Sequence, residues 1–205
     1  MKNIIHLEYH NADDLSIERI NTAYHNMENK DFPYQAYKSI KEIEEIKIPI
    51  IVLFAEKYLA NNHSIVIFVV CKTTLYKLAE KLETDCLICP DFSDEDISNN
   101  IEEFKNNKKK IMIMTLTSNY GEKFNNFDNI PVIILVGISR IKFSPHQLYW
   151  RLCARGTKVL PILKSIFIAK STEENFCIKL KEYILSNNES FYKLAIHYIG
   201  ISLIE

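Results

Sequence analysis

Short apolar runs alternate with amphipathic segments between residues 64 and 185, and this alternation is the strongest structural signal in the chain. Continuous β-branched runs without a polar residue at every second position are typical of strands buried on both faces. The expected strands are 64–70, 85–89, 111–115, 131–136 and 165–169, and the expected helices are 73–82, 94–106, 146–153 and 172–185. Such alternation predicts parallel crossover units, and hence an α/β fold with an open, mainly parallel sheet and helices on both faces.

The residues before the first expected strand divide into a polar stretch and a helical one. Residues 1–33 are rich in His and Asn and carry one weak helical pattern, so we interpret them as an N-terminal extension. From residue 34, apolar residues recur at a three-residue step, which predicts a helix, and Pro49 permits a second helix up to residue 59. These helices form a lead-in to a domain that we place at 34–187, followed by a C-terminal helical tail over 188–205.

Charge is unevenly distributed along the chain, although the net charge of its 205 residues is only -1. Residues 129–172 contain no Asp or Glu, and their basic residues are Arg140, Lys142, Arg151, Arg155, Lys158, Lys164 and Lys170. Ligands of open α/β sheets collect beyond the carboxyl ends of the strands, where the loops of this basic block can meet phosphate. A solvated basic face is an equally good interpretation of the block from composition alone.

Several catalytic and metal-binding patterns are missing from the chain. None of its glycines is followed by Lys, so there is no Walker A loop to cradle nucleotide phosphates. Cys86 and Cys89 lack the two further ligands that a zinc site needs, and the odd number of cysteines among apolar neighbours is typical of reduced core thiols. The chain has neither a signal-peptide pattern nor an apolar run of about 18 residues. We therefore expect a soluble, intracellular protein with no metal site and no membrane partner.

A series of short motifs follows in a suggestive order along the chain. In chain order they are Glu44-x-x-Lys47-x-Pro49, Thr73-Thr74, Phe104-x-x-Asn107 and Thr172-Glu173-Glu174. The series resembles the C-terminal RecA-like motor domain of superfamily 2 helicases, especially the form found in large DNA viruses and phages. This resemblance extends from residue 37 to residue 185, and it implies a RecA-like sheet and a nucleic-acid partner, either DNA or RNA.

Two motifs of that family contact the nucleic-acid backbone. Thr73-Thr74 is similar to motif IV, and the segment from Thr115 to Gly121 is similar to motif V, with one glycine left of the family's Gly-Gly-x-Gly. The resemblance implies that the nucleic-acid-binding residues are Thr73, Thr74, Thr115, Thr117 and Ser118. Hydroxyl side chains and backbone amides are common phosphate contacts, which agrees with that role.

The family's motif VI reads Gln-x-x-Gly-Arg-x-x-Arg and is only partly matched here. Gln147 and Arg151 are in register, whereas Trp150 and Ala154 replace the glycine and the second arginine. The resemblance implies that Gln147, Arg151 and Gly121 bind nucleotide and that Arg151 and Arg155 are catalytic. Arg155 is displaced by one position, which turns a helical side chain by about 100°. It can serve only if the helix ends locally, as the following glycine permits.

In this family ATP is clamped between two motor domains. The resemblance therefore implies that the chain is at most half of an ATP-dependent helicase, and that ATP and Mg²⁺ bind only in a composite site with a partner that supplies the first RecA-like domain. Other implied partners are viral replication or transcription proteins, in the host cytoplasm or the virion. Two alternatives remain open. The first is a degenerate, non-catalytic binding or scaffold module, which the departures in motifs V and VI favour. The second is an unrelated response-regulator-like module, although the phosphoacceptor Asp of such modules is missing from this chain.

Overall fold

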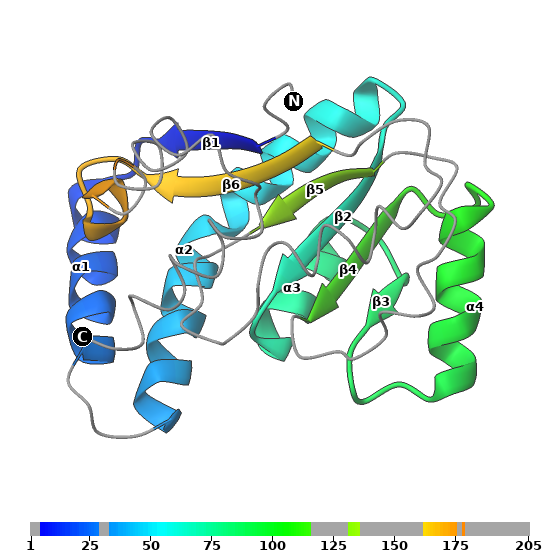
Figure 1. Cartoon of the computed structure of the whole chain (residues 1–205), viewed down its shortest axis with the longest axis horizontal. Coiled ribbons are helices and arrows are strands. Elements are labelled where there is room, and N and C mark those ends of the chain that lie inside the picture. The colour runs from blue at the N-terminus through cyan, green and yellow to red at the C-terminus, as the bar shows by residue number, and fades with distance from the viewer. Residues whose placement is uncertain (1–4, 29–32, 116–130, 136–161, 176–177, 179–205) are drawn as a thin grey trace, which may run out of the picture.

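One parallel sheet organises the part of the chain that the structure describes (Figure 1). The structure is a computed structural model, and it describes residues 5–28, 33–115, 131–135, 162–175 and 178. The strands are β1 (Ile5–His10), β2 (Ser64–Val69), β3 (Leu87–Ile88), β4 (Ile111–Thr115), β5 (Pro131–Leu135) and β6 (Ile162–Ile168). They lie in the order β1-β6-β5-β2-β4-β3, and every neighbouring pair is parallel. The predicted α/β fold with a parallel sheet is confirmed.

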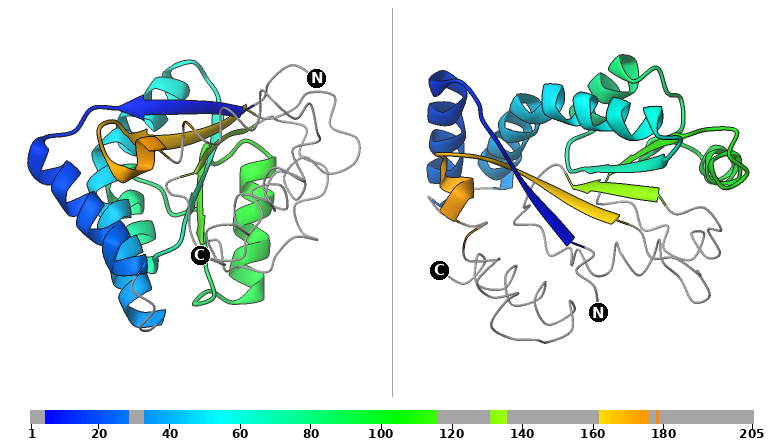
Figure 2. Two further views of the ribbon diagram at one scale, coloured as in Figure 1. Left: turned by 60° about the vertical axis from the view of Figure 1, so that its left-hand side comes forward. Right: turned by 90° about the horizontal axis from the view of Figure 1, so that it is seen from above.

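Helices cover both faces of this sheet. They are α1 (Asp14–Glu28), α2 (Pro33–Ala60), α3 (Lys72–Lys81) and α4 (Asp94–Lys105). Figure 2 shows α2 and α3 on one side of the sheet and α4 on the other. Strand β2 alternates between two cores, because successive side chains of a strand point to opposite faces. Ile65 and Ile67 pack in a core with residues of α2 and α3, and Val66 and Phe68 pack in a core with residues of α1, α4 and the first half of α2.

The lead-in is one helix and not two. Helix α2 continues through Pro49, although a proline inside a helix removes one amide donor and costs stability. Pro49 is exposed on α2, whereas Ile43, Ile48 and Ile51 on the opposite stripe are buried. Burial of that stripe outweighs the local defect, which lies on the side of the helix where Pro49 is exposed.

The polar N-terminal stretch contributes a strand and a helix. Strand β1 pairs with β6 in the register Glu8↔Ile166, at one edge of the sheet. Its apolar and polar residues alternate at every second position, in the sequence Ile5-His6-Leu7-Glu8-Tyr9-His10, which is the pattern of a half-buried strand. Asn21 on α1 accepts hydrogen bonds from the Thr172 amide and hydroxyl at 2.7 and 2.8 Å, which fastens α1 to the turn after β6.

Polar side chains hold two of the expected helix starts. Ser93 and Asp96 form a capping box at the start of α4, whose first turn is acidic. After β6, residues 172–175 are helical. The Ser171 hydroxyl accepts from the Glu173 amide at 3.2 Å, and the Glu174 carboxylate accepts from the Lys170 amide at 2.6 Å, an arrangement offset by one residue from a capping box. The expected helix over 146–153 lies outside the described residues.

Candidate functional site at the carboxyl edge of the sheet

The carboxyl ends of β2, β4 and β6 define the edge at which parallel α/β sheets bind ligands. Thr73 lies in the first turn of α3, directly after β2, and is exposed. Its neighbour Thr74 is fully buried, and Thr115, the last residue of β4, is 1% exposed. The first turn of α3 therefore offers the surrounding solvent the Thr73 hydroxyl, while Thr74 and Thr115 face the interior.

The other predicted site residues lie outside the described residues. They are Thr117, Ser118 and Gly121 in motif V, and Gln147, Arg151 and Arg155 in motif VI. The nucleotide-binding and catalytic predictions therefore remain predictions. What the structure does describe is how the strand ends at this edge are held in place.

Glu44 on α2 holds the junction between β2 and α3. Its carboxylate is 1% exposed and accepts hydrogen bonds from the Val70 amide at 2.5 Å and the Cys71 amide at 3.1 Å. Cys71 is the N-cap of α3 and provides no side-chain cap of its own, and Glu44 holds the amides of this residue and of the one before it. A carboxylate here also interacts favourably with the α3 dipole.

The electrostatics of this junction are set by burial. Desolvation raises the pKa of Glu44, and the two backbone amides oppose the shift because they favour the charged form. Burial, with a contribution from the Glu44 charge, raises the pKa of the Cys71 thiol to about 12. Cys71 is therefore a protonated core thiol and not a nucleophile.

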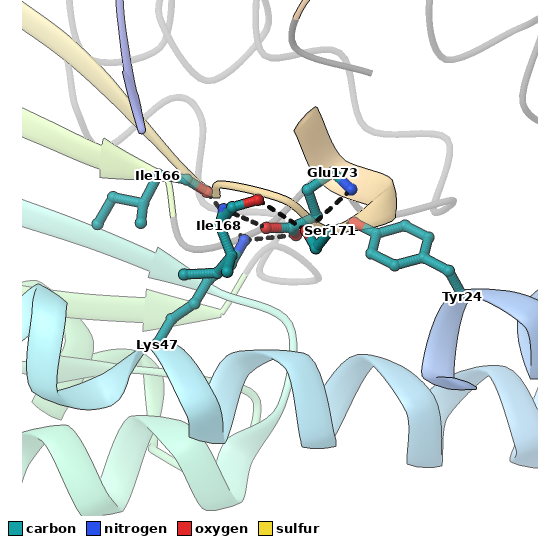
Figure 3. Close-up of polar contacts among 6 residues, drawn as sticks. All are labelled: Tyr24, Lys47, Ile166, Ile168, Ser171 and Glu173. Carbon is teal, nitrogen blue, oxygen red and sulfur yellow. Dashed lines mark hydrogen bonds and ion pairs between the residues drawn. The ribbon is translucent and has the colours of Figure 1, made fainter. Parts of the chain in front are cut away.

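Lys47, one helical turn further along α2, holds the end of β6 (Figure 3). Its ammonium donates to the Glu173 carboxylate at 2.6 Å and to the Ile166 carbonyl at 2.8 Å, and both charged side chains are fully buried. Glu173 also accepts from the Tyr24 hydroxyl at 2.9 Å and from the Ile168 amide at 3.0 Å. This network joins α1, α2 and the residues that follow β6. The buried Glu173 carboxylate accepts hydrogen bonds from three groups, namely the Lys47 ammonium, the Tyr24 hydroxyl and the Ile168 amide.

Glu44, Lys47 and Glu173 belong to the motif series that carries the resemblance, but they are not among the site residues predicted from the sequence. A signal for them was present in α2, where Glu44 and Lys47 fall at helical spacing within the buried stripe of Ile40, Ile43, Ile48 and Ile51. A charge within an apolar stripe is expected to have a buried partner, because an unpaired buried charge is costly. The identity of those partners is decided by the tertiary fold.

Some lysines of the candidate phosphate-binding regions are engaged elsewhere. Lys164 of the basic block is 7% exposed and donates to the Glu8 carboxylate on β1 at 2.5 Å. Lys72, next to Thr73, pairs with Asp91, and this partner raises the pKa of the Lys72 ammonium. Lys164 consequently stabilises the pairing of two strands, whereas Lys72 is half exposed at the carboxyl edge.

The described residues contain no group of three or more His, Cys, Asp or Glu side chains that could hold a metal ion. Cys86 is buried, its thiol donates to the Asn100 carbonyl at 3.4 Å, and burial raises its pKa to about 12. Cys89 is also a buried free cysteine. Among the described helices, none has the length and apolar character needed to cross a membrane.

No family model matches the chain, and no curated protein matches it. Its fold is similar to that of the C-terminal part of the Fun30 ATPase domain, with a TM-score of 0.55 at 12% identity over 97% of each chain. The helicase domain of Pyrococcus furiosus Hef (TM-score 0.48, 13% identity) and S. cerevisiae Dbp5 bound to RNA and ADP BeF3 (0.49, 14%) match 83% and 78% of this chain. The chain spans 37% of the Hef chain and 43% of the Dbp5 chain. The likeness to Fun30 shows a shared fold, that of a RecA-type α/β domain.

Proposed function

We propose that this chain is the second motor domain of a superfamily 2 nucleic-acid-dependent ATPase, and that it binds the nucleic-acid backbone at the carboxyl edge of its sheet. The observation that carries the proposal is the fold likeness to the C-terminal part of an ATPase domain, which extends over 97% of both chains. The motif series in the sequence supports the same assignment independently, because it places Thr73 at the position of a backbone contact.

Thr73 is the described residue best placed for such a contact. It is exposed in the first turn of α3, where the amide groups and the helix dipole favour an approaching phosphate, and Thr74 beside it is buried. Motifs V and VI supply the remaining contacts in this proposal, through Thr117, Ser118, Gly121, Gln147, Arg151 and Arg155. ATP and Mg²⁺ bind in a composite site whose Walker A and B half belongs to a partner chain.

A salt-dependent titration tests the nucleic-acid part of the proposal. We expect micromolar binding of labelled single-stranded DNA or RNA that weakens linearly with the logarithm of salt concentration, as phosphate contacts require. Thr73→Ala should weaken binding about fivefold, the effect of one hydrogen bond of about 1 kcal/mol. The Arg151→Ala, Arg155→Ala double variant should weaken it further.

The matched control is Thr84→Ala. Thr84 lies at the opposite edge of the sheet, where its hydroxyl donates to the Ile111 carbonyl at 3.0 Å, so the loss of its side chain should leave the affinity unchanged. Absence of binding by the wild-type chain at low salt refutes the proposed function. Equal losses for Thr73→Ala and Thr84→Ala refute the assignment of the binding edge.

A non-catalytic binding module is the second candidate, favoured by Ala154 at the position of the family's second arginine. That arginine stabilises charge on the transferring phosphoryl group and is worth about 10³ to 10⁵ in rate where it acts as an arginine finger. ATP hydrolysis that appears when a separately produced first motor domain is mixed with this chain supports the split enzyme. Nucleic-acid binding without any such activity supports the module.

A further inference from the structure

Two buried charges on α2 reach the ends of two different strands. Glu44 accepts from the amides that follow β2, and Lys47 donates to a carbonyl near the end of β6 and to Glu173 in the turn beyond it. Both strands are neighbours of β5, which lies between them in the sheet. A single rigid helix is therefore hydrogen-bonded to the strand ends on either side of β5.

We propose that Glu44 and Lys47 are positioning residues of the nucleic-acid-binding edge, and that they hold the ends of β2 and β6 so that the first turn of α3 presents Thr73 in one orientation. The inference rests on the proposed nucleic-acid binding and adds to it two residues that touch no ligand. Glu44 orients the turn directly, and Lys47 anchors the same helix to β6.

The chemistry of the two contacts is better suited to orienting the strand ends than to stabilising the core. Apolar side chains of similar size in place of a buried ion pair are often neutral or stabilising, so the charges are not needed to hold the core together. Hydrogen bonds to a carboxylate are directional and short, and those of Glu44 end on two consecutive amides of one turn. Without them, the Val70 and Cys71 amides lack their buried acceptor, and the first turn of α3 can fray.

Lys47 provides the counterpart at β6. Its ammonium bridges the Ile166 carbonyl and Glu173, and Glu173 in turn accepts from the Ile168 amide and from Tyr24 on α1, as Figure 3 shows. Because α2 is anchored at β6 in this way, it cannot slide along the sheet and carry Glu44 away from α3. The two contacts thus form one positioning unit, which we call the α2 clamp (Glu44, Lys47 and Glu173).

Amide hydrogen exchange and nucleic-acid affinity, measured on the same full-length variants, test the clamp. Glu44→Gln keeps the size of the side chain but offers only one acceptor oxygen, so one amide loses its partner. We expect exchange at residues 70–73 to accelerate about tenfold or more, the factor that corresponds to one hydrogen bond to a charged group. The dissociation constant for a labelled single-stranded oligonucleotide should rise about fivefold at a temperature where the variant is fully folded.

Glu45→Gln is the matched control on the neighbouring position. Glu45 forms a surface ion pair with Lys77, so its neutral variant should change neither exchange at 70–73 nor affinity. A second variant, Lys47→Met with Glu173→Gln, removes the anchor at β6 without leaving a buried charge unpaired, and should accelerate exchange at 166–168. If Glu44→Gln does not fold, this second variant tests the clamp in its place: weaker nucleic-acid binding supports the clamp, and unchanged affinity overturns it.

The outcomes separate the clamp from the proposed function. Faster exchange at residues 70–73 with weaker binding in Glu44→Gln, and neither change in Glu45→Gln, supports the clamp. Faster exchange with unchanged affinity overturns its link to binding, because the turn is then loosened without effect on the ligand. If the wild-type chain binds no nucleic acid, the proposed function fails, and the clamp is judged on exchange: equal exchange in Glu44→Gln and Glu45→Gln overturns it.

Discussion

Removal of the Lys47 ammonium is the most informative perturbation of stability that the structure offers. Lys47→Met keeps an unbranched side chain in the same space but leaves the Glu173 carboxylate without its counter-charge in a fully buried site. The variant also takes a hydrogen bond from the Ile166 carbonyl. Met itself adapts well to irregular core spaces, so steric strain contributes little to the expected effect.

The magnitude follows from the hydrogen bonds that Glu173 keeps. Breaking a buried ion pair by removal of one partner costs about 3–5 kcal/mol. Glu173 still accepts from the Tyr24 hydroxyl and the Ile168 amide, which places the expected loss at the lower end, about 3 kcal/mol. In a chain of this length, that loss lowers the melting temperature by roughly 10 °C. Addition of Glu173→Gln removes the unpaired charge and should restore about 2 kcal/mol.

A second pair on the same helix provides the control. Lys41 and Glu45 form a surface pair at 3.9 Å, and Lys41→Met with Glu45→Gln applies the same substitutions to exposed side chains. Their coupling energy should be about 0.5 kcal/mol or less. The free energies of unfolding of all variants are obtained from urea titrations followed by circular dichroism, and the two coupling energies come from double-mutant cycles. A cost for Lys47→Met no larger than that for Lys41→Met would refute the reasoning, because it would mean that the buried carboxylate needs no counter-charge.

Three further predictions concern other parts of the described chain. His10→Phe should flatten the pH dependence of the unfolding free energy below about pH 6.5, which is the ordinary pKa of His. Burial lowers the pKa of His10 in the folded state, and the Lys47 charge adds to this shift whereas Glu8 opposes it. The unfolded state therefore binds the proton first, so the wild-type chain loses stability as pH falls from 6.5, and equal slopes for both proteins contradict this assignment. Glu83→Gly should stabilise the chain by about 0.5–1 kcal/mol relative to Glu83→Ala in urea titrations, because Glu83 has a φ of 49° just past the C-cap of α3. A glycine variant that is no more stable than the alanine variant argues against backbone strain at this position. Iodoacetamide at neutral pH should leave Cys71 and Cys86 unmodified in the folded chain, since the pKa of each thiol is raised to about 12. Peptide mapping that finds either thiol labelled as fast as in the unfolded chain disproves the prediction.

The elements between residues 64 and 115 could be predicted from the sequence because their signals are local. An apolar run such as 64–70 is long enough for a strand and too uniform for a surface helix, and β2 was found at Ser64–Val69. The amphipathic segment 94–106 predicted a helix, and α4 was found at Asp94–Lys105. In each case the residues that form the element also carry the information that identifies it.

Strand β1 and the continuity of α2 were decided by tertiary packing. The alternation of β1 is weak evidence in isolation, because a short edge strand acquires its apolar contacts only when β6 lies beside it. Pro49 divides a helix in an isolated peptide, whereas here the helix continues because one stripe of α2 is buried on the sheet and Pro49 faces solvent.

The α2 clamp shows most directly where sequence reasoning ends. The stripe of α2 carries Glu44 and Lys47 among buried isoleucines, but their partners lie 26 and 126 residues further along the chain. Hydrophobic periodicity specifies which face of a helix is covered, since it depends on residues a few positions apart. Which amide or carboxylate meets a buried charge depends on the order of the strands in the sheet, and only the tertiary structure decides that order.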